Sequence, residues 1–419
     1  MRAVRAYGCA LVVVLAACRT QPAAPSVEKS AEGARAAAPA RDASPRSMKE
    51  LPTTDHTIAV GNLQAQIADY EKRLAKAPNG PAILKALVGL YAMRAQFFSR
   101  LDDYDRAGAL AERLVKVAPA DGEAWAARAG CRASMHRFQD ALADLDEAER
   151  RGVRNDELAG ARASIYQALG RYGDAAKIRE RKAREWPTLA SLGALASLRA
   201  EEGNTDEAER LFIEAQDKFS DVSPFSLAWL YLQEGLMWQK AGYLSRAREL
   251  FEAAHERLPE YAPVTSHLAS VEAVTGSRDR AIALVRPLVD GSDDPEYAGQ
   301  LASLLADGGD KAEAAALRAR AADRYRQLIA QHPAAFADHA ARFWLGPGGD
   351  AKQALALARL NLDARKTSES YELVIDAALA AGTTKIACDA AERALALPKP
   401  SPPLRLAAAR AADTCARVN

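Results

Sequence analysis

Alanine recurs along this chain at a nearly constant interval, which is its clearest pattern of small apolar positions. Successive copies are 34, 34, 33, 39, 34, 33, 40 and 33 residues apart. Such a period indicates a stack of structural repeats. Alanine favours helices and lets them pack closely. The nine recurring positions are Ala107, Ala141, Ala175, Ala208, Ala247, Ala281, Ala314, Ala354 and Ala387.

A glycine stands five residues before each of the last seven of these alanines. A glycine there suits the residue just after a helix, where a positive φ costs little without a Cβ. A second small residue stands twelve positions upstream of most marker alanines, as two closely crossing helices require. Each unit is therefore predicted to be helix, tight turn, helix. The glycines are Gly170, Gly203, Gly242, Gly276, Gly309, Gly349 and Gly382.

Two units carry the pattern most fully. They read Tyr166-x-x-Leu169-Gly170-Arg171-Tyr172-x-x-Ala175 and Trp238-x-x-Ala241-Gly242-Tyr243-x-x-x-Ala247-x-x-x-Phe251-x-x-Ala254. These segments resemble the tetratricopeptide repeat (TPR), an antiparallel pair of helices, and the resemblance covers about residues 80–400. It implies an all-α fold, an α-solenoid of about nine TPR-like repeats. Residues 57–401 would form the solenoid with its opening helix, and residues 402–419 a terminal capping helix that shields the exposed apolar face.

Two units depart from the regular length. The first carries about seven extra residues between Tyr91 and Ala107, including Phe97 and Phe98. The spacing of 40 predicts a longer second helix in the unit that ends near His332.

The first seventeen residues are predicted to be a signal peptide. Arg2 and Arg5 precede an apolar stretch that is too short to span a bilayer, which needs about 20 residues. Leu15-Ala16-Ala17-Cys18 resembles the lipobox of bacterial lipoproteins, which implies that Cys18 is acylated. Residues 18–56 are predicted to be the lipidated cysteine and a disordered tether rich in Ala, Pro and Ser. The alternative is ordinary signal cleavage with Cys18 incidental.

Location follows from the same segment. Arg19, rather than Asp, follows Cys18, which in lipoproteins of Gram-negative bacteria resembles sorting to the outer membrane.

The formal net charge of the chain is +1, so its charge balance does not indicate binding to nucleic acid. Alanine makes up 95 of 419 residues and aromatic residues only 6%, a composition that argues against a β-sandwich or β-barrel.

Catalytic signatures are absent from the sequence. It contains no HExxH, GxSxG, Walker or GxGxxG motif. His332 and His339 could share a helix only if it ran through Pro333, so no metal site is predicted. We expect no enzyme activity and no cofactor. Cys388 and Cys415 could form a disulfide that pins the terminal helix, and the alternative that the cysteines are reduced and buried is favoured at least as strongly.

Partner binding is expected on the concave side, where TPR ligands often lie. Most positions there are small, but two groups of larger side chains stand out, and such anchors often form binding hot spots. The alternative is that both groups are core. The predicted partner-contact residues are Trp229, Leu232 and Leu236 in one unit, and Phe336, His339 and Phe343 in another.

The sequence therefore predicts a non-enzymatic scaffold for a protein or peptide partner, lipid-anchored in the bacterial cell envelope. A pilotin-like assembly factor for an outer-membrane secretin or pilus is one alternative. A regulator of peptidoglycan-synthesising enzymes is another.

Overall fold

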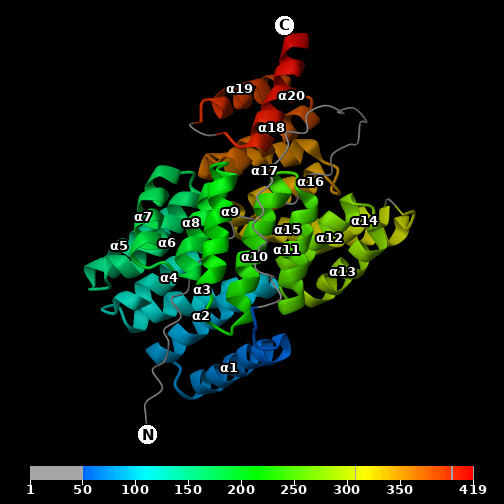
Figure 1. Ribbon diagram of the computed structural model, residues 1–419. Helices are drawn as coiled ribbons and strands as arrows, with labels where there is room; N and C mark the ends of the chain where they lie inside the picture. Colours follow the sequence, from blue (N-terminus) through cyan, green and yellow to red (C-terminus); the bar gives the residue numbers. More distant parts are fainter. Residues whose placement is uncertain (1–50, 307, 398–399, 419) are drawn as a thin grey trace.

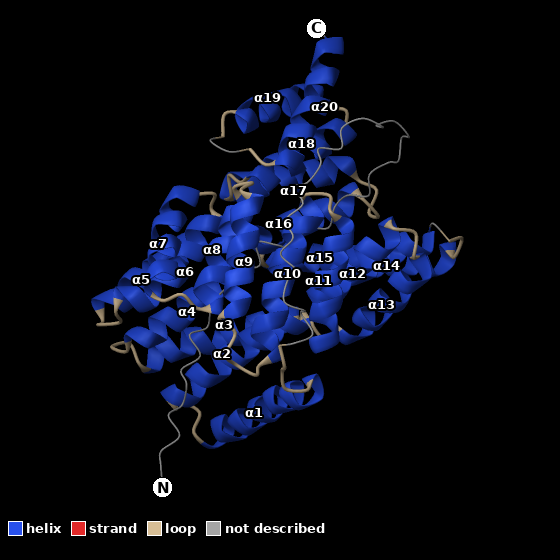
Figure 2. Ribbon diagram, in the orientation of Figure 1, coloured by secondary structure: helices blue, strands red, loops and turns tan. Residues whose placement is uncertain are grey.

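The computed structural model describes residues 51–306, 308–397 and 400–418, so the signal segment and Cys18 lie outside the described residues. Twenty helices and no strand occur in this part of the chain (Figure 2). The all-α prediction is confirmed.

The helices form nine antiparallel pairs between an opening helix and a closing helix, as the α-solenoid prediction requires. The opening helix is α1 (His56–Lys76) and the closing helix is α20 (Pro402–Val418). The pairs are α2 (Pro81–Phe98) and α3 (Leu101–Val117), α4 (Gly122–Ser134) and α5 (Phe138–Arg150), α6 (Asn155–Ala168) and α7 (Tyr172–Glu185), α8 (Leu189–Glu201) and α9 (Thr205–Asp217), α10 (Pro224–Lys240) and α11 (Leu244–Arg257), α12 (Ala262–Val274) and α13 (Arg278–Gly291), α14 (Pro295–Ala306) and α15 (Lys311–Gln331), α16 (Pro333–Leu345) and α17 (Ala351–Ala364), and α18 (Ser368–Ala380) and α19 (Thr384–Leu395).

All nine marker alanines are buried, each at most 1% exposed. They lie on the second helix of each pair, where the two helices approach most closely. The upstream small residues serve the same contact: a Cβ added to Gly235 would lie 2.5 Å from the ring of Phe251. Small side chains at the crossing are therefore a steric requirement of the fold.

The predicted turn glycines all adopt positive φ, between 68° and 94°. In the α4–α5 pair the same position is held by His136, whose φ is 54°. A histidine in this region of backbone space is uncommon and points to a special role for its side chain.

The two units of irregular length contain longer helices, α15 and α2. α15 is 21 residues long, whereas α11 and α13 have 14 residues each. α2 is 18 residues long, and its extra end carries Phe97 into the interior. The Phe97 ring lies 4.9 Å from that of Phe225 and 4.6 Å from that of Tyr261.

The N-terminal boundary of the folded part differs from the prediction. The tether was expected to continue through residue 56, but residues 51–55 already contact the helical body. The Thr54 N–H donates to Val222 O at 2.6 Å, and an Arg257 N–H donates to Leu51 O at 3.5 Å. These backbone contacts were not visible in a segment with few apolar side chains.

The stack winds into a superhelix that meets itself after one turn. In Figure 1 the chain passes from α4–α9 on one side to α11–α14 on the other, and α16 and α17 lie between them. Leu101 N–H, for example, bonds to Asp293, 192 residues away. We call the contact between residues 99–240 and residues 292–369 the seam.

We predict that enlarging a marker alanine destabilises the fold. Ala247→Leu should lower the free energy of unfolding by about 1–3 kcal/mol, because the crossing has no room for added methylenes. Urea unfolding followed by circular dichroism measures this change. Glu249→Leu, at an exposed position of the same helix, is the control. An equal effect of both substitutions would contradict this description of the crossing.

Candidate functional site

The six predicted partner-contact side chains lie in the interior. The exposed fraction is 6% for Trp229, 4% for Leu232, 2% for Leu236, 8% for Phe336 and 5% for Phe343. The His339 side chain is 12% exposed. The prediction of an open, aromatic groove is therefore corrected, because the chain's own helices occupy that space.

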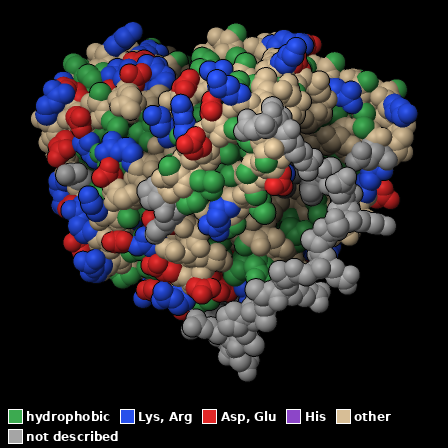
Figure 3. Space-filling view, turned by 90° about the horizontal axis from the view of Figure 1, so that it is seen from above, with side chains coloured by type: hydrophobic (Ala, Val, Ile, Leu, Met, Phe, Trp, Pro, Cys, Tyr) green, Lys and Arg blue, Asp and Glu red, His purple; other side chains and the backbone are tan. Residues whose placement is uncertain are grey.

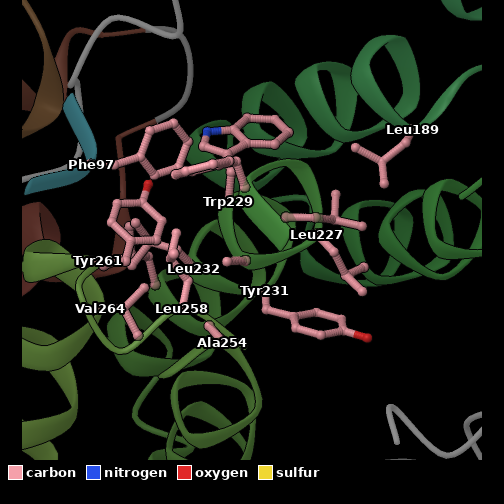
Figure 4. Close-up of a cluster of buried hydrophobic side chains, with 14 of the residues drawn as sticks. Phe97, Leu189, Leu227, Trp229, Tyr231, Leu232, Ala254, Leu258, Tyr261 and Val264 are labelled. Carbon is pink, nitrogen blue, oxygen red and sulfur yellow. The ribbon is translucent and has the colours of Figure 1, made fainter. Parts of the chain in front are cut away.

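The first group belongs to the core around α10. Trp229 and Leu232 lie beside Phe97 of α2 and Tyr261, which precedes α12 (Figure 4). On the α8 side, a Cβ added to Gly193 would lie 3.0 Å from the Trp229 ring. The extended end of α2, which the sequence showed only as extra residues, thus covers this face of α10.

The second group is divided between the core and a small cavity. Phe336 packs with Leu101 and Leu328 across the seam. The Phe343 ring lies 5.0 Å from that of Tyr325. His339 Nδ1 lies 3.4 Å from a carboxylate oxygen of Glu296. A partner has no direct access to Phe336 or Phe343 in this arrangement.

The cavity lies between α14 and α16. Its volume is about 40 Å³, and Glu296, Gln300, His339, Arg342 and Phe343 are among its lining residues. Because one water needs roughly 10–15 Å³ on this measure, the cavity has room for a few waters. Gln300 is already engaged, since its amide donates to Ser266 O and Ser270 Oγ, both at 2.9 Å. The cavity is too small to receive a peptide.

One end of the seam is tightly closed. Asp293 accepts hydrogen bonds from the N–H groups of Leu101 and Asp102, at 2.6 and 2.9 Å, and so caps α3 from the opposite side of the seam. A carboxylate suits the positive end of a helix. Ser99 Oγ and Tyr297 Oη are 2.6 Å apart, and both residues are at most 1% exposed. We call Ser99, Asp293 and Tyr297, together with the Leu101–Leu328–Phe336 cluster, the apolar end of the seam.

The middle of the seam is joined by His136 and Arg365. His136 Nδ1 lies 3.0 Å from Ala334 O, and burial lowers the pKa of His136 to about 4, so the neutral ring donates this bond. Arg365 Nε donates to Ala168 O at 3.2 Å, and Arg365 Nη1 to Asp338 at 3.3 Å. The role of His136 explains why a histidine replaces the turn glycine in this unit.

The other end of the seam is charged, and we call it the polar end. The Lys240 ammonium group pairs with the Glu369 carboxylate, and these side chains are 33% and 27% exposed. Deeper inside, the Gln167 amide donates to Glu201 at 2.7 Å. Arg179 donates to Ser164 Oγ at 3.4 Å and forms no ion pair with the described residues. The polar end comprises these six residues.

Burial at and beside this end favours the neutral form of two carboxyls, whereas neighbouring cations keep Glu369 ionised by lowering its pKa. Burial raises the pKa of Glu201 to about 7; Lys240 opposes this shift and Glu369 adds to it. Burial also raises the pKa of Glu372 to about 7. For Asp338, burial would raise the pKa, but the positive charge of His339, Arg365 and other neighbours lowers it far below its usual range. Glu201 at the polar end and Glu372 beside it therefore titrate near neutral pH.

No group of three or more His, Cys, Asp or Glu residues is arranged to hold a metal ion within the described ranges. α15 ends before His332 and α16 begins at Pro333, so His332 and His339 do not share a helix. His332 Nε2 instead lies 2.8 Å from Asp105, across the seam. The one helix that could have paired these histidines is not formed.

The three cysteines of the described chain have different roles. A disulfide joins Cys388 of α19 to Cys415 of α20, with Cα atoms 6.2 Å apart. It ties the closing helix to the last pair, as one of the two sequence alternatives proposed. Cys131 is buried, and burial raises the pKa of its thiol to about 12.

The described face of the molecule seen in Figure 3 carries side chains of both charges. Figure 3 shows Lys and Arg side chains interspersed with Asp and Glu on the face seen from above. Many of these groups are paired, such as Arg162 with Asp146 at 2.6 Å and Arg286 with Glu313. The described surface therefore matches the near-zero net charge of the whole chain.

Sequence reasoning missed the seam. Asp293, Arg365, Glu201 and Glu369 carried no repeat signal, because their partners lie at unrelated repeat positions. The exception is His136, which stands where seven later units have glycine. That departure was a visible signal for a residue whose side chain makes a long-range contact.

No protein-family model matches the chain, and no curated protein matches it. Among solved structures it is similar to the human IFIT1 dimer with PPP-AAAA, with 19% identity over 79% of this chain and 77% of that chain and a TM-score of 0.45. It is also similar to a tetratricopeptide repeat protein from Parabacteroides merdae, with 16% identity over 57% of this chain and 91% of that chain and a TM-score of 0.37. A third similar structure is the Cut9–Hcn1 hetero-tetramer of the APC/C, with 13% identity over 84% of this chain and 76% of that chain and a TM-score of 0.42. The TPR-like fold is evident from the helix pairs themselves.

We predict that neutralising Glu201 stabilises the protein at high pH. The pKa of Glu201 is about 7 in the folded chain, above its ordinary value of 4.5. Between these values the folded chain holds a proton that the unfolded chain lacks, so the free energy of unfolding falls as pH rises. Glu201→Gln should raise the urea midpoint at pH 8 and change it little at pH 4.

The control for this prediction is Glu214→Gln, at an exposed position of α9. It should leave the urea midpoint unchanged at both pH values. A Glu201→Gln effect that is equal at pH 4 and pH 8 would show that Glu201 is not held neutral by its surroundings.

Proposed function

We propose that this protein is a non-enzymatic scaffold that binds protein partners in the bacterial cell envelope. The observation that carries the proposal is the continuous stack of nine helix pairs, each of which adds a similar ridge to one extended surface. Stacked helix pairs of this kind are rigid, and together they present a long surface to which a partner can bind.

The lipid anchor rests on the sequence of residues 1–18. In the described part of the chain, no helix is both long and apolar enough for a membrane span. In the proposal, acyl chains on Cys18 supply the membrane affinity, at about 0.8 kcal/mol for each buried CH₂.

The attachment of residues 51–55 supports an orientation for the body. These residues contact Val222 in the α9–α10 loop, and His56 Nδ1 lies 2.9 Å from Glu260 in the α11–α12 loop. The tether therefore joins the body at the end that carries these two loops. We infer that this end is nearest to the membrane and that the α18–α20 end is available to partners.

The two more specific roles remain alternatives within this proposal. A pilotin-like factor would be needed for assembly of an outer-membrane secretin or pilus. A regulator of peptidoglycan-synthesising enzymes would leave assembly intact and alter wall synthesis. Deletion of the gene separates them, because each role predicts a different defect.

We predict that Cys18→Ser releases the protein from membranes. Without acyl chains the mature chain has no strong membrane affinity, so at least nine-tenths should move from the outer-membrane fraction to the soluble periplasmic fraction. Fractionation of cells followed by immunoblotting measures this. Ser26→Ala, in the same segment, is the control and should stay in the membrane fraction. Retention of Cys18→Ser in the membrane would contradict the lipoprotein proposal.

Partner binding is tested by site-specific photo-crosslinking in intact envelopes. We place the crosslinking side chain at Lys366, which is exposed beside the seam, and at Ile213, which is 42% exposed on α9. The proposal predicts a defined protein adduct from at least one position in the wild-type background. Absence of any adduct, together with hydrolysis of wall or glycan substrates by the purified protein, would overturn it.

A further inference from the structure

The two ends of the seam are closed by different kinds of contact. At the apolar end, Leu101, Leu328 and Phe336 are buried together, and Asp293 caps α3 through two backbone N–H groups. Separating this end would expose buried apolar side chains to water and would leave the helix terminus uncapped. This end is therefore expensive to open.

No buried apolar cluster of the described residues crosses the polar end. α8 and α10 contribute to one cluster and α18 to another. The connections across this end include the Lys240–Glu369 ion pair and, nearer the middle of the seam, the hydrogen bond from Arg365 Nε to Ala168 O. Because both ion-pair side chains are partly exposed, solvent screens the pair and weakens its contribution to closure.

The closed polar end also leaves polar groups unsatisfied. Gln167 Oε1 and Arg179 Nε are buried without a hydrogen-bond partner. Burial keeps the pKa of Glu201 near 7, so closure opposes its ionisation at neutral pH. Water that enters on opening would satisfy all three groups. Closure at this end is thus favoured by a partly exposed ion pair and opposed by the burial of polar groups that lack partners.

A glycine marks a close approach of the two sides near this end. A Cβ added to Gly170 would lie 2.6 Å from the carbonyl oxygen of Lys366. Gly203 occupies the same repeat position with nearly the same φ, 77° against 78°, yet a Cβ there would meet nothing within 4 Å. The two glycines thus have the same backbone requirement, and only Gly170 faces the opposite side of the seam.

From these contacts we propose that the polar end of the seam is a latch. The ends of α6, α8 and α10 separate there from the α17–α18 segment, while the apolar end holds as the hinge. The closed form is self-occupied: the C-terminal helices cover the inner face of the N-terminal pairs, and release of the latch uncovers Gln167, Arg179 and Glu201. This device concerns the chain alone, so it stands whether or not the proposed scaffold function is correct.

The test compares two glycine substitutions by amide hydrogen exchange and mass spectrometry, using the mature full-length protein in detergent. Gly170→Ala should act as a wedge and accelerate exchange of residues 165–171 and 365–371 about fivefold or more. Gly203→Ala carries the same backbone strain and should accelerate only its own turn. Residues 99–105 and 292–297, at the hinge, should exchange as in the wild type.

A charge swap keeps the test decisive if the glycine variant folds poorly. Lys240→Glu replaces attraction with repulsion and should accelerate exchange of residues 365–371 about two- to fivefold. Combining it with Glu369→Lys should restore the wild-type rate. The proposal is overturned if the double variant is not restored, if both glycine variants behave alike, or if exchange rises equally at both ends of the seam.

Discussion

Close crossing of the two helices in each pair is the constraint on which this structure depends. Alanine or glycine at the crossing allows the backbones to approach, and larger apolar residues beside it fill the remaining space. The ring of Phe251 against Gly235 shows how little room is left. Because each pair buries its apolar side against other pairs, a single oversized residue affects the stack beyond its own pair.

Repetition of one crossing geometry gives the stack a curvature, and the curvature brings distant repeats into contact. The resulting seam is filled by side chains that the repeat pattern does not dictate. Its apolar end resembles ordinary core, whereas its polar end contains a partly exposed ion pair and buried polar atoms without a hydrogen-bond partner. The stack is here closed on its own C-terminal helices, so the aromatic residues that were expected to line a groove lie in the core.

Local structure could be predicted from sequence because it depends on short-range rules. The turn glycines, the marker alanines and the long helix before His332 all followed from spacing. The predicted groove around Trp229 and Phe336 was wrong because accessibility depends on superhelical closure, which joins residues about 200 positions apart. Burial of the same apolar side chains is compatible with either a groove or a core, so composition alone could not distinguish them. His136 was the one visible departure from the repeat that marked a seam contact.

Closure of the superhelix on itself is tested most directly by a distance across the seam. Spin labels at Arg171→Cys and Lys366→Cys, in a Cys18→Ser background, would be measured by double electron–electron resonance. The closed chain predicts a main population with labels within about 20 Å, since Gly170 contacts Lys366. An open stack at about 10 Å per repeat would separate the labels by roughly 50–60 Å. A single population at that longer distance would contradict the account.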